Sequence, residues 1–330
     1  MMKLIDLNTI PSSITIVVAN ALSISPAFAV ECYETVTTTA FLTENLHCEL
    51  TSENPYAIIV SGPSGNLQIQ GDGGITCTGN SDMEDQFGLL IEGTGRQVRG
   101  GIIENCPGGI LVSGSGSHSI LNMEIKNYYL DDGIKINSDN NIIKGNTITG
   151  NPLYSGDDGI DSNGNYNLIT HNTIKYAGDE GILIDGEDST VLHNYISYSG
   201  DDGIDLDGTR GVVSFNTSEH NSGDGILIDT NNASVSQNTA NYNGAEGIEI
   251  ADDSSNNIVR GNTANSNQTV GILIEETSSE SNIIRGNTAL GNMNYDLSSP
   301  GADPTCLNLA NEWGNNTAES SEPACLRFLP

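Results

Sequence analysis

The sequence predicts an all-β chain folded as a parallel β-helix, a rod in which successive turns of the chain stack on one another. The segment Tyr154–Asp161 returns 44 residues later as Tyr198–Asp205, with a variant, Tyr176–Leu183, midway between them. Each step is 22 residues, and a fixed period of this size is typical of repeat architectures. Within each repeat, short runs alternate between apolar and polar residues, which is the period-2 pattern of a strand.

Each predicted coil carries two markers, a glycine followed by an aliphatic residue and, 13 residues later in most coils, an asparagine. Strands of successive coils would pair in parallel ~4.8 Å apart, giving about ten coils of ~22 residues. Asparagine tolerates the unusual backbone angles of a bend, and its amide can bond the asparagine of the next coil. We therefore expect an asparagine ladder inside the rod, formed by Asn146, Asn172, Asn194, Asn216, Asn238, Asn262 and Asn287.

Residues 1–29 have the features of an export signal. Lys3 provides a short basic region, residues 14–24 form an apolar stretch, and Ala27-Phe28-Ala29 fits a cleavage site. No other apolar run is long enough to span a bilayer, so we expect no membrane insertion. The expected product is secreted, either to the extracellular space, the periplasm or the cell surface.

The remaining chain divides into three segments. Residues 30–56 are Thr-rich and are expected to form an N-terminal cap, because the end of a solenoid exposes unpaired strands and apolar core. Residues 57–297 hold the coils, and residues 298–330 leave the repeat and are expected to form a C-terminal disulfide cap around Trp313.

All six cysteines lie after the predicted cleavage site, and an even number in an exported chain suggests disulfides. Six cysteines allow 15 pairings. Their clustering favours the pairs Cys32–Cys48, Cys77–Cys106 and Cys306–Cys325.

The chain is strongly acidic, with a formal net charge of -32 and only 11 Lys and Arg residues. This charge argues against nucleic acid or an anionic membrane as a partner, because both would repel the protein. The same charge can equally serve as a solubility device.

Counting from the marker glycine shows that the acidic residues recur in columns. The column one residue before glycine contains Asp132, Asp158, Glu180, Asp202, Asp224 and Glu246. The column two residues before it contains Asp131, Asp157, Asp179 and Asp201. The column two residues after it contains Lys135, Asp161, Leu183, Asp205, Leu227, Glu249 and Leu273.

Stacked carboxylates present an energetic difficulty. Two of them ~5 Å apart repel by about 1 kcal/mol in water and by about 3 kcal/mol at an effective dielectric of 20. Either some carboxyls are protonated or a cation lies among them, and Ca²⁺ suits such oxygen cages. We expect Ca²⁺ at Asp158, Asp179, Glu180 and Asp202. The alternative is that the side chains extend into water among ordinary counterions.

The same columns offer catalytic candidates. Carboxyls one coil apart approach the ~5–5.5 Å of retaining glycosidases, and offsets of two coils approach the ~6.5–9.5 Å of inverting ones. One acid would protonate the leaving oxygen while another activated water. The candidates are Asp157, Asp158, Asp161, Asp201, Asp202 and Asp205.

Lys135 and a row of tyrosines complete the candidate site. Lys135 stands one coil from Asp161 and would serve as the base of a lyase or epimerase, or else form an ordinary surface ion pair. Tyr154, Tyr176 and Tyr198 would offer aromatic faces to sugar rings, or else pack one shoulder of the rod.

The Gly-Ile-x-Ile and Asn-Thr-Ile repeats resemble those of right-handed parallel β-helix proteins, the pectin-lyase-like superfamily, over roughly residues 57–297. The resemblance implies a right-handed rod and an action on carbohydrate, since the superfamily includes pectate lyases, polygalacturonases, alginate epimerases, phage depolymerases and non-catalytic surface proteins. The Gly-His-Gly and Arg-x-Lys motifs of polygalacturonases are absent.

Two functions from different classes follow. The first is an exported, monomeric polysaccharide lyase, epimerase or glycoside hydrolase that uses an acidic, calcium-binding face on a polysaccharide or cell-surface glycan. This hypothesis rests on the acidic and tyrosine columns, which are densest in the same central coils. The second is a non-catalytic, calcium-stabilised surface or glycan-binding rod, because neighbouring repeats are nearly identical where a catalytic site needs one coil to differ.

Overall fold

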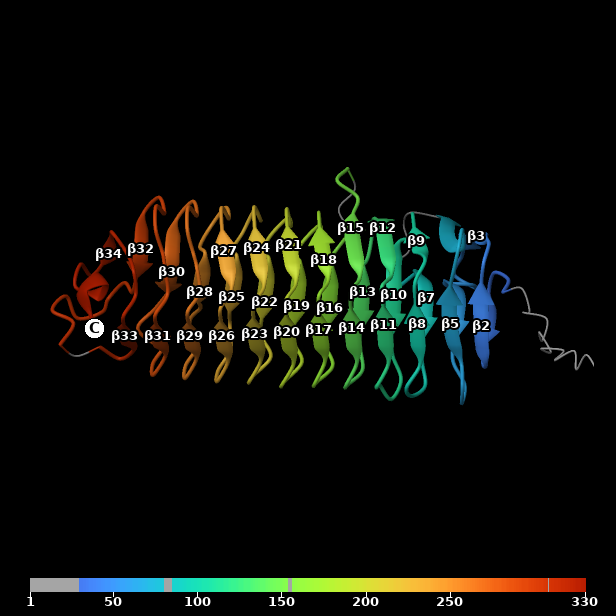
Figure 1. Ribbon diagram of the computed structural model, residues 1–330, viewed down its shortest axis with the longest axis horizontal. Helices are drawn as coiled ribbons and strands as arrows, with labels where there is room; N and C mark the ends of the chain where they lie inside the picture. The colour runs from blue at the N-terminus through green and yellow to red at the C-terminus, as the bar shows by residue number, and fades with distance from the viewer. Residues whose placement is uncertain (1–29, 80–84, 154–155, 308) are drawn as a thin grey trace, which may run out of the picture.

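The structure, a computed structural model, describes residues 30–79, 85–153, 156–307 and 309–330. These residues form a straight rod of three parallel sheets, A, B and C, and each turn of the chain adds a strand to each sheet along most of the rod (Figure 1). The export signal predicted for residues 1–29 lies outside the described residues, as does Tyr154.

The strands are short, most of them three residues long. Sheet A contains, in order, β1 (Glu34–Val36), β4 (Tyr56–Val60), β7 (Phe87–Ile91), β10 (Gly108–Val112), β13 (Ile134–Ile136), β16 (Ile160–Ser162), β19 (Ile182–Ile184), β22 (Ile204–Leu206), β25 (Ile226–Ile228), β28 (Ile248–Ile250), β30 (Val270–Ile274), β32 (Tyr295–Ser298) and β34 (Ser321–Glu322).

Sheet B contains β2 (Thr39–Leu42), β5 (Asn66–Ile69), β8 (Gln97–Arg99), β11 (Ser119–Leu121), β14 (Ile142–Lys144), β17 (Leu168–Thr170), β20 (Thr190–Leu192), β23 (Val212–Ser214), β26 (Ser234–Ser236), β29 (Ile258–Arg260), β31 (Ile283–Arg285) and β33 (Glu312–Gly314). Sheet C contains β3 (Asn45–Leu50), β6 (Gly74–Gly79), β9 (Ile102–Glu104), β12 (Glu124–Tyr128), β15 (Thr147–Gly150), β18 (Thr173–Lys175), β21 (Tyr195–Ser197), β24 (Thr217–Glu219) and β27 (Thr239–Asn241). A short 3-10 helix, η1 (Leu326–Phe328), follows near the C-terminus.

Each strand pairs in register with its equivalents in the coils before and after it, so equivalent residues stack. Ile182 pairs with Ile160 on one side and with Ile204 on the other. These isoleucines point inward and are fully buried, whereas Leu183, which directly follows Ile182, is only half-buried. The inward-facing residues of the period-2 pattern therefore form the core, as predicted. The all-β parallel β-helix is confirmed.

The rod has about 12 turns, since sheet B has 12 strands, instead of the ten predicted. The additional turns lie at the ends, where the glycine marker is missing. Residues 30–56, expected to be a cap, contain β1, β2 and β3, which pair with β4, β5 and β6 and form a complete coil. In the last segment, β33 and β34 extend sheets B and A.

The asparagine ladder stacks at the bend between sheets B and C. Its seven members are at most 2% exposed, and each side-chain amide donates to the carboxamide oxygen of the next. Asn216 also donates to the backbone oxygen of Val191 over 2.9 Å. The ladder thus satisfies backbone groups that the bend removes from the strand pairing.

Two further asparagine ladders, which were not predicted, occupy the other bends. One runs through Asn221, Asn243, Asn267 and Asn292 between sheets C and A. The other links Asn257, Asn282 and Asn311 between sheets A and B.

Three disulfides join Cys32 to Cys48, Cys77 to Cys106 and Cys306 to Cys325. Within the described residues, no helix is long or apolar enough to cross a membrane.

We predict that Asn216→Ala lowers the free energy of unfolding by about 1–3 kcal/mol, because it leaves buried amide and carbonyl groups without partners. The matched control is Thr217→Ala, at the next residue, whose side chain is half-exposed. This substitution should change stability by less than about 0.5 kcal/mol. Urea unfolding followed by circular dichroism measures both. Equal losses for the two variants would refute a structural ladder.

Candidate functional site

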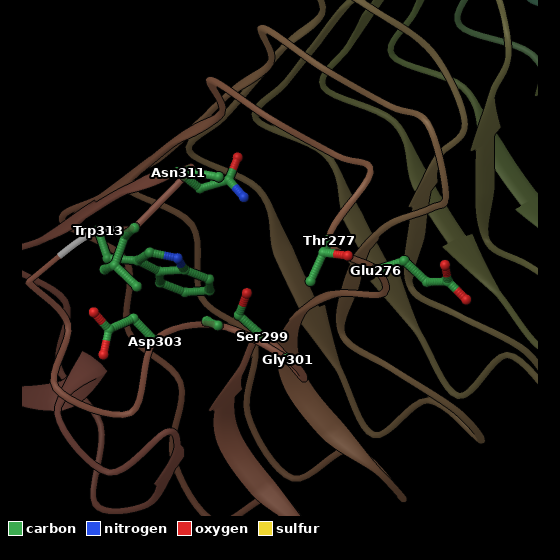
Figure 2. A pocket seen from close by; sticks show the side chains of 10 residues that line it. Glu276, Thr277, Ser299, Gly301, Asp303, Asn311 and Trp313 are labelled. Carbon is green, nitrogen blue, oxygen red and sulfur yellow. The ribbon is translucent and has the colours of Figure 1, made fainter.

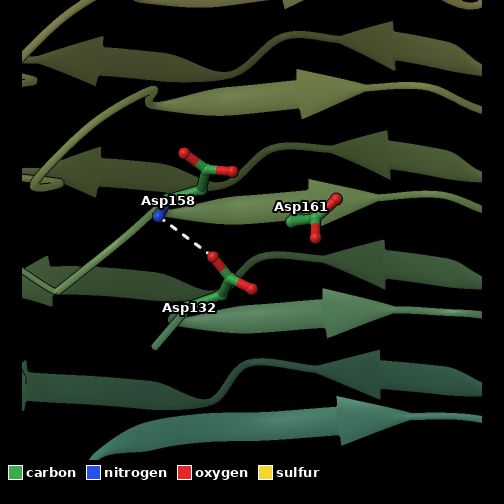
Figure 3. A group of neighbouring side chains, drawn as sticks. All are labelled: Asp132, Asp158 and Asp161. Atoms are coloured by element: carbon green, nitrogen blue, oxygen red, sulfur yellow. Dashed lines mark hydrogen bonds between the residues drawn. The ribbon is translucent and has the colours of Figure 1, made fainter. Parts of the chain in front are cut away.

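The six acids that directly precede the marker glycines form a second kind of ladder, which we call the acid ladder: Asp132, Asp158, Glu180, Asp202, Asp224 and Glu246. Oδ1 of Asp132 accepts the backbone N–H of Asp158 over 3.0 Å, as Figure 3 shows. Asp158 in turn accepts the N–H of Glu180 over 3.0 Å. These two carboxyls therefore bind the backbone of the next coil.

The same contact recurs further along the ladder. Oδ1 of Asp202 accepts the N–H of Asp224, and Oδ1 of Asp224 accepts that of Glu246 over 2.7 Å. The glycine after each acid is required by the close stacking here. A Cβ at Gly159 would lie 2.5 Å from the backbone oxygen of Gly181, which no side chain tolerates.

Burial changes the charge state of the acid ladder. Asp132, Asp158, Asp202 and Asp224 are 1–8% exposed. Burial raises the pKa of Asp202 to about 7, although the hydrogen bond from the backbone of Asp224 lowers it. Burial, with neighbouring carboxylates as a further cause, also raises the pKa values of Asp158 and Asp224 strongly. At neutral pH the ladder is therefore partly protonated.

Lys135, on β13, is the one basic residue in the sheet A columns and lies beside the start of the acid ladder. Its Nζ lies 2.9 Å from Oδ2 of Asp132, 3.4 Å from Oδ2 of Asp161 and 3.6 Å from Oδ1 of Asp131. Burial lowers the pKa of Lys135, but the hydrogen bond and charge of Asp132 outweigh it and raise the pKa. Lys135 is thus a counter-charge in this setting, and proton abstraction would first require the loss of these ion pairs.

Three exposed acids, Asp157, Asp179 and Asp201, lie beside the ladder, and we call them the outer acids. Oxygens of Asp157, Asp158 and Asp179 lie within 4.8 Å of one another, and so do those of Asp179, Glu180 and Asp201. Calcium–oxygen distances of 2.3–2.6 Å allow two ligand oxygens to lie up to about 5 Å apart. Both groups therefore fit a calcium ion geometrically.

The structure brings three of the four predicted metal ligands into these groups. Asp202, the fourth, belongs to neither, because its oxygen is turned to the backbone of Asp224. A further group that the sequence reasoning missed, Asp224, Glu246 and Glu249, lies at the far end of the same face. These three residues belong to the acidic columns of the sequence, but the prediction followed the central coils, where the acids are densest.

The remaining catalytic candidates lie on the outward face of sheet A. Asp161 is only 7% exposed, and its carboxylate accepts the side-chain N–H of Asn163 over 2.8 Å. Asp205 is half-buried, and among the described residues its Oδ1 has no hydrogen-bond partner. Burial raises the pKa of Asp205, with Asp207 as the next cause.

A groove of about 330 Å³ runs beside the outer acids. Asn151, Pro152 and Leu153 form one wall, and the side of the rod at Tyr176 and Tyr198 forms the other. Its volume is within the range of small-ligand sites. Gly178 and Gly200, which directly precede Asp179 and Asp201, also line this groove. Two of the outer acids, Asp179 and Asp201, therefore lie at its border.

The exposed tyrosines stack on one another along the rod. The rings of Tyr176 and Tyr198 are 5.3 Å apart, and those of Tyr198 and His220 are 5.4 Å apart. Tyr242 follows at 5.2 Å from His220. We call this row of rings, Tyr176, Tyr198, His220 and Tyr242, the tyrosine stripe. Because its ring faces cover each other, the stripe exposes ring edges and tyrosine hydroxyls to a ligand along most of its length. Tyr128, in the same column, is fully buried.

A second pocket lies under the C-terminal segment (Figure 2). It has about 110 Å³ of space and is lined by Trp313, Asn311, Thr277 and Ser299, among others. This volume is well below the ~300 Å³ of small-molecule sites. The pocket also lies in the last coils, away from the outer acids, so the groove is the better candidate for a polysaccharide.

The acid ladder predicts that the protein loses stability as pH rises. Because the folded state holds protons that the unfolded chain has released above about pH 4, the free energy of unfolding should fall from pH 5 through pH 8. Asp202→Asn keeps an acceptor for the N–H of Asp224 and should stabilise the protein by about 1–3 kcal/mol at pH 8.

Thermal unfolding at pH 5 and pH 8 measures this effect. The exposed Asp252→Asn, which also removes one charge, should leave the pH slope almost unchanged. A slope of the opposite sign would contradict the assignment of buried, protonated carboxyls.

Comparison with known proteins identifies the fold. Residues 132–289 match a family model described as a right handed beta helix region. No curated protein sequence matches this chain.

Solved structures with similar folds include enzymes and a surface protein. The periplasmic alginate epimerase AlgG shares 16% identity, with a TM-score of 0.63 over 88% of this chain and 79% of that protein. The A-module of the Azotobacter vinelandii mannuronan C-5 epimerase AlgE6 shares 12% identity, with a TM-score of 0.62 over 86% and 91%. PfbA, a surface adhesin of Streptococcus pneumoniae, shares 11%, with a TM-score of 0.60 over 79% of each chain. At these identities the similarity is one of fold, and the chain is a right-handed parallel β-helix repeat protein.

Proposed function

We propose that this protein is exported and acts on a polysaccharide that lies in the groove between residues 151–153 and the tyrosine stripe. The observation that carries the proposal is the position of the groove, which brings a ligand to the border of ionisable acids backed by protonated ones. Two of the similar folds belong to an alginate epimerase and a mannuronan C-5 epimerase, which supports carbohydrate as the substrate class. The three disulfides support an oxidising compartment outside the cytoplasm.

The chemistry rests on a buried carboxyl and exposed carboxyls that lie in one place. Burial raises the pKa of Asp202 to about 7, and Oδ1 of Asp202 accepts the N–H of Asp224, which leaves Oδ2 to carry the proton in this proposal. Asp201 and Asp179 are exposed and lie beside it. A protonated acid next to an ionised one can pass a proton to a leaving glycosidic oxygen while the partner activates water or attacks the sugar.

The tyrosines and Lys135 contribute to binding in this proposal. Tyr176 and Tyr198 present hydroxyls and ring edges to the sugar hydroxyls at the groove wall. Lys135 neutralises Asp132 and Asp161, which limits the repulsion that an anionic sugar would meet at that end of the face.

We further propose that Ca²⁺ is held by the outer acids together with Asp158 and Glu180. When bound, the ion supplies positive charge that neutralises the acids and any carboxylate of the sugar. The chain's own contribution is the placement of these oxygens, which the coil spacing fixes.

A second candidate function is a non-catalytic, calcium-stabilised glycan-binding rod. The observation that favours it is the recurrence of the acid ladder over six coils, with four of the six acids bonded to the backbone of the next coil, since a single catalytic centre does not require such repetition. Similarity to the adhesin PfbA is compatible with this function.

Turnover separates the two functions. We expect the purified protein to release reducing ends or unsaturated products, or to epimerise uronates, from at least one member of a panel of neutral and uronic acid polysaccharides. Asp202→Asn and Asp201→Asn should each reduce the rate by about 100-fold or more, because each removes one partner of the proton transfer. Asp252→Asn, on a distant turn, is the control. Binding to a glycan without any product favours the second candidate, and neither binding nor product would refute the whole proposal.

Calcium should reverse the loss of stability at high pH. At pH 8, millimolar Ca²⁺ should raise the melting temperature and EDTA should lower it, because the ion binds the folded state alone, where Asp158 releases its proton on becoming a ligand. Asp179→Asn, which removes an oxygen shared by two groups, should abolish most of this shift. A melting temperature insensitive to both Ca²⁺ and EDTA would exclude the metal.

A further inference from the structure

Sheet B presents a face that differs in charge from the rest of the molecule. Its outward positions contain four cations, Arg99, Lys144, Arg260 and Arg285, and one acid, Glu312, a net charge of +3 (four minus one) against -32 for the chain. Glu312 lies at the end and pairs with Arg285 over 3.0 Å. Figure 1 shows the strands of this sheet side by side along the rod.

The centre of the face is uncharged and partly apolar. Ile142 and Ile258 are 39% and 40% exposed, although they lie on regular strands. The half-exposed aliphatic residues between and around them are Leu121, Leu168, Leu192, Val212 and Ile283. Sheet C carries charges of both signs on its outward positions, with Glu104, Glu124 and Glu219 beside Lys126 and Lys175. An apolar face on so acidic a protein suggests a contact surface.

The charges at the two edges of this face are opposite within individual coils. Lys144 ends its strand, and the exposed Asp139 precedes the start of the same strand. Arg260 ends β29, and the exposed Asp253 lies in the turn before it. Arg285 and Glu280 stand in the same relation around β31.

We propose that sheet B is the interface of a side-by-side dimer with a second copy of this chain, related by a two-fold axis parallel to the rod. This axis places each strand of sheet B opposite the strand of the same coil in the second copy, and the two strands run in opposite directions. The end of each strand therefore faces the start of its counterpart. Lys144 then faces Asp139 of the second copy, and Arg260 faces its Asp253. A two-fold axis parallel to the strands, and so perpendicular to the rod, would instead place the acidic edge of one copy opposite the acidic edge of the other.

The size of the face is sufficient for a specific contact. Twelve strands at ~4.8 Å make it roughly 50 Å long, and strands of three residues make it about 10 Å wide. Each copy thus contributes about 500 Å², and the pair buries about 1,000 Å², the lower limit for specific interfaces. Turns at both edges, including Phe215 at 53% exposure, enlarge it. The dimer replaces the monomer expected from the sequence, and it leaves the groove and the acid ladder accessible.

Sedimentation equilibrium of the full chain over a micromolar concentration range tests this proposal. The wild type should dimerise, and Lys144→Glu with Arg260→Glu should weaken the dimer by about tenfold or more. Adding Asp139→Lys and Asp253→Lys to that variant should restore it, which an antiparallel arrangement would not do. The control, Lys126→Glu with Lys175→Glu on sheet C, makes the same charge change and should have no effect.

Leu192→Glu, at the centre of the face, should give a monomer whose circular dichroism and melting temperature match those of the wild type. A wild type that stays monomeric at high micromolar concentration would overturn the proposal. A dimer that is unaffected by both the double charge reversal and Leu192→Glu would do the same.

Discussion

The repeat of one coil above another at ~4.8 Å is the constraint on which the rest of this structure depends. It places every side chain directly beside its equivalent, whatever its chemistry. Stacked isoleucines form the core, and stacked asparagines donate and accept along a row. Stacked carboxylates can do neither while both are ionised, so the acid columns are where the fold and its electrostatics conflict.

The structure reduces this conflict in three ways. Backbone N–H groups of the next coil bond to most of the ladder carboxyls, such as Asp132 and Asp158. Burial favours their neutral forms, and Lys135 neutralises one end of the face. Among the described residues, no ion pair neutralises Asp179 or Asp201, the outer acids that border the groove, and this contrast supports the cation and the acid–base chemistry proposed there.

The sequence alone predicted the fold because its markers carry direct physical meaning. The glycine at the start of the central sheet A strands reflects the close backbone approach, and the buried asparagines at one bend reflect a repeated need for hydrogen bonds. The extra coils at both ends were missed because β1 and β33 lack these markers. Tyr128 belongs to the tyrosine column, but it is fully buried, with its ring packed against Gly156.

The site was less predictable for a related reason. Spacing showed that the acids stand in columns, but not that the inner column turns its oxygens toward the backbone while the outer one remains exposed. Nor did it show that the tyrosine faces cover each other, since ring orientation depends on the turn geometry. The basic and apolar face of sheet B was visible only once the register of its strands was known, because its residues are scattered over residues 39–314.

The central claim is that burial holds carboxyls of the acid ladder in the protonated state far above their ordinary pKa. Carbon-13 NMR of the aspartate side-chain carboxyls across pH 3–9, without metal, measures this directly. The account predicts that Asp202 titrates near pH 7 and that Asp158 and Asp224 remain protonated beyond it. Titration of all three near pH 4, the ordinary value for aspartate, would contradict it.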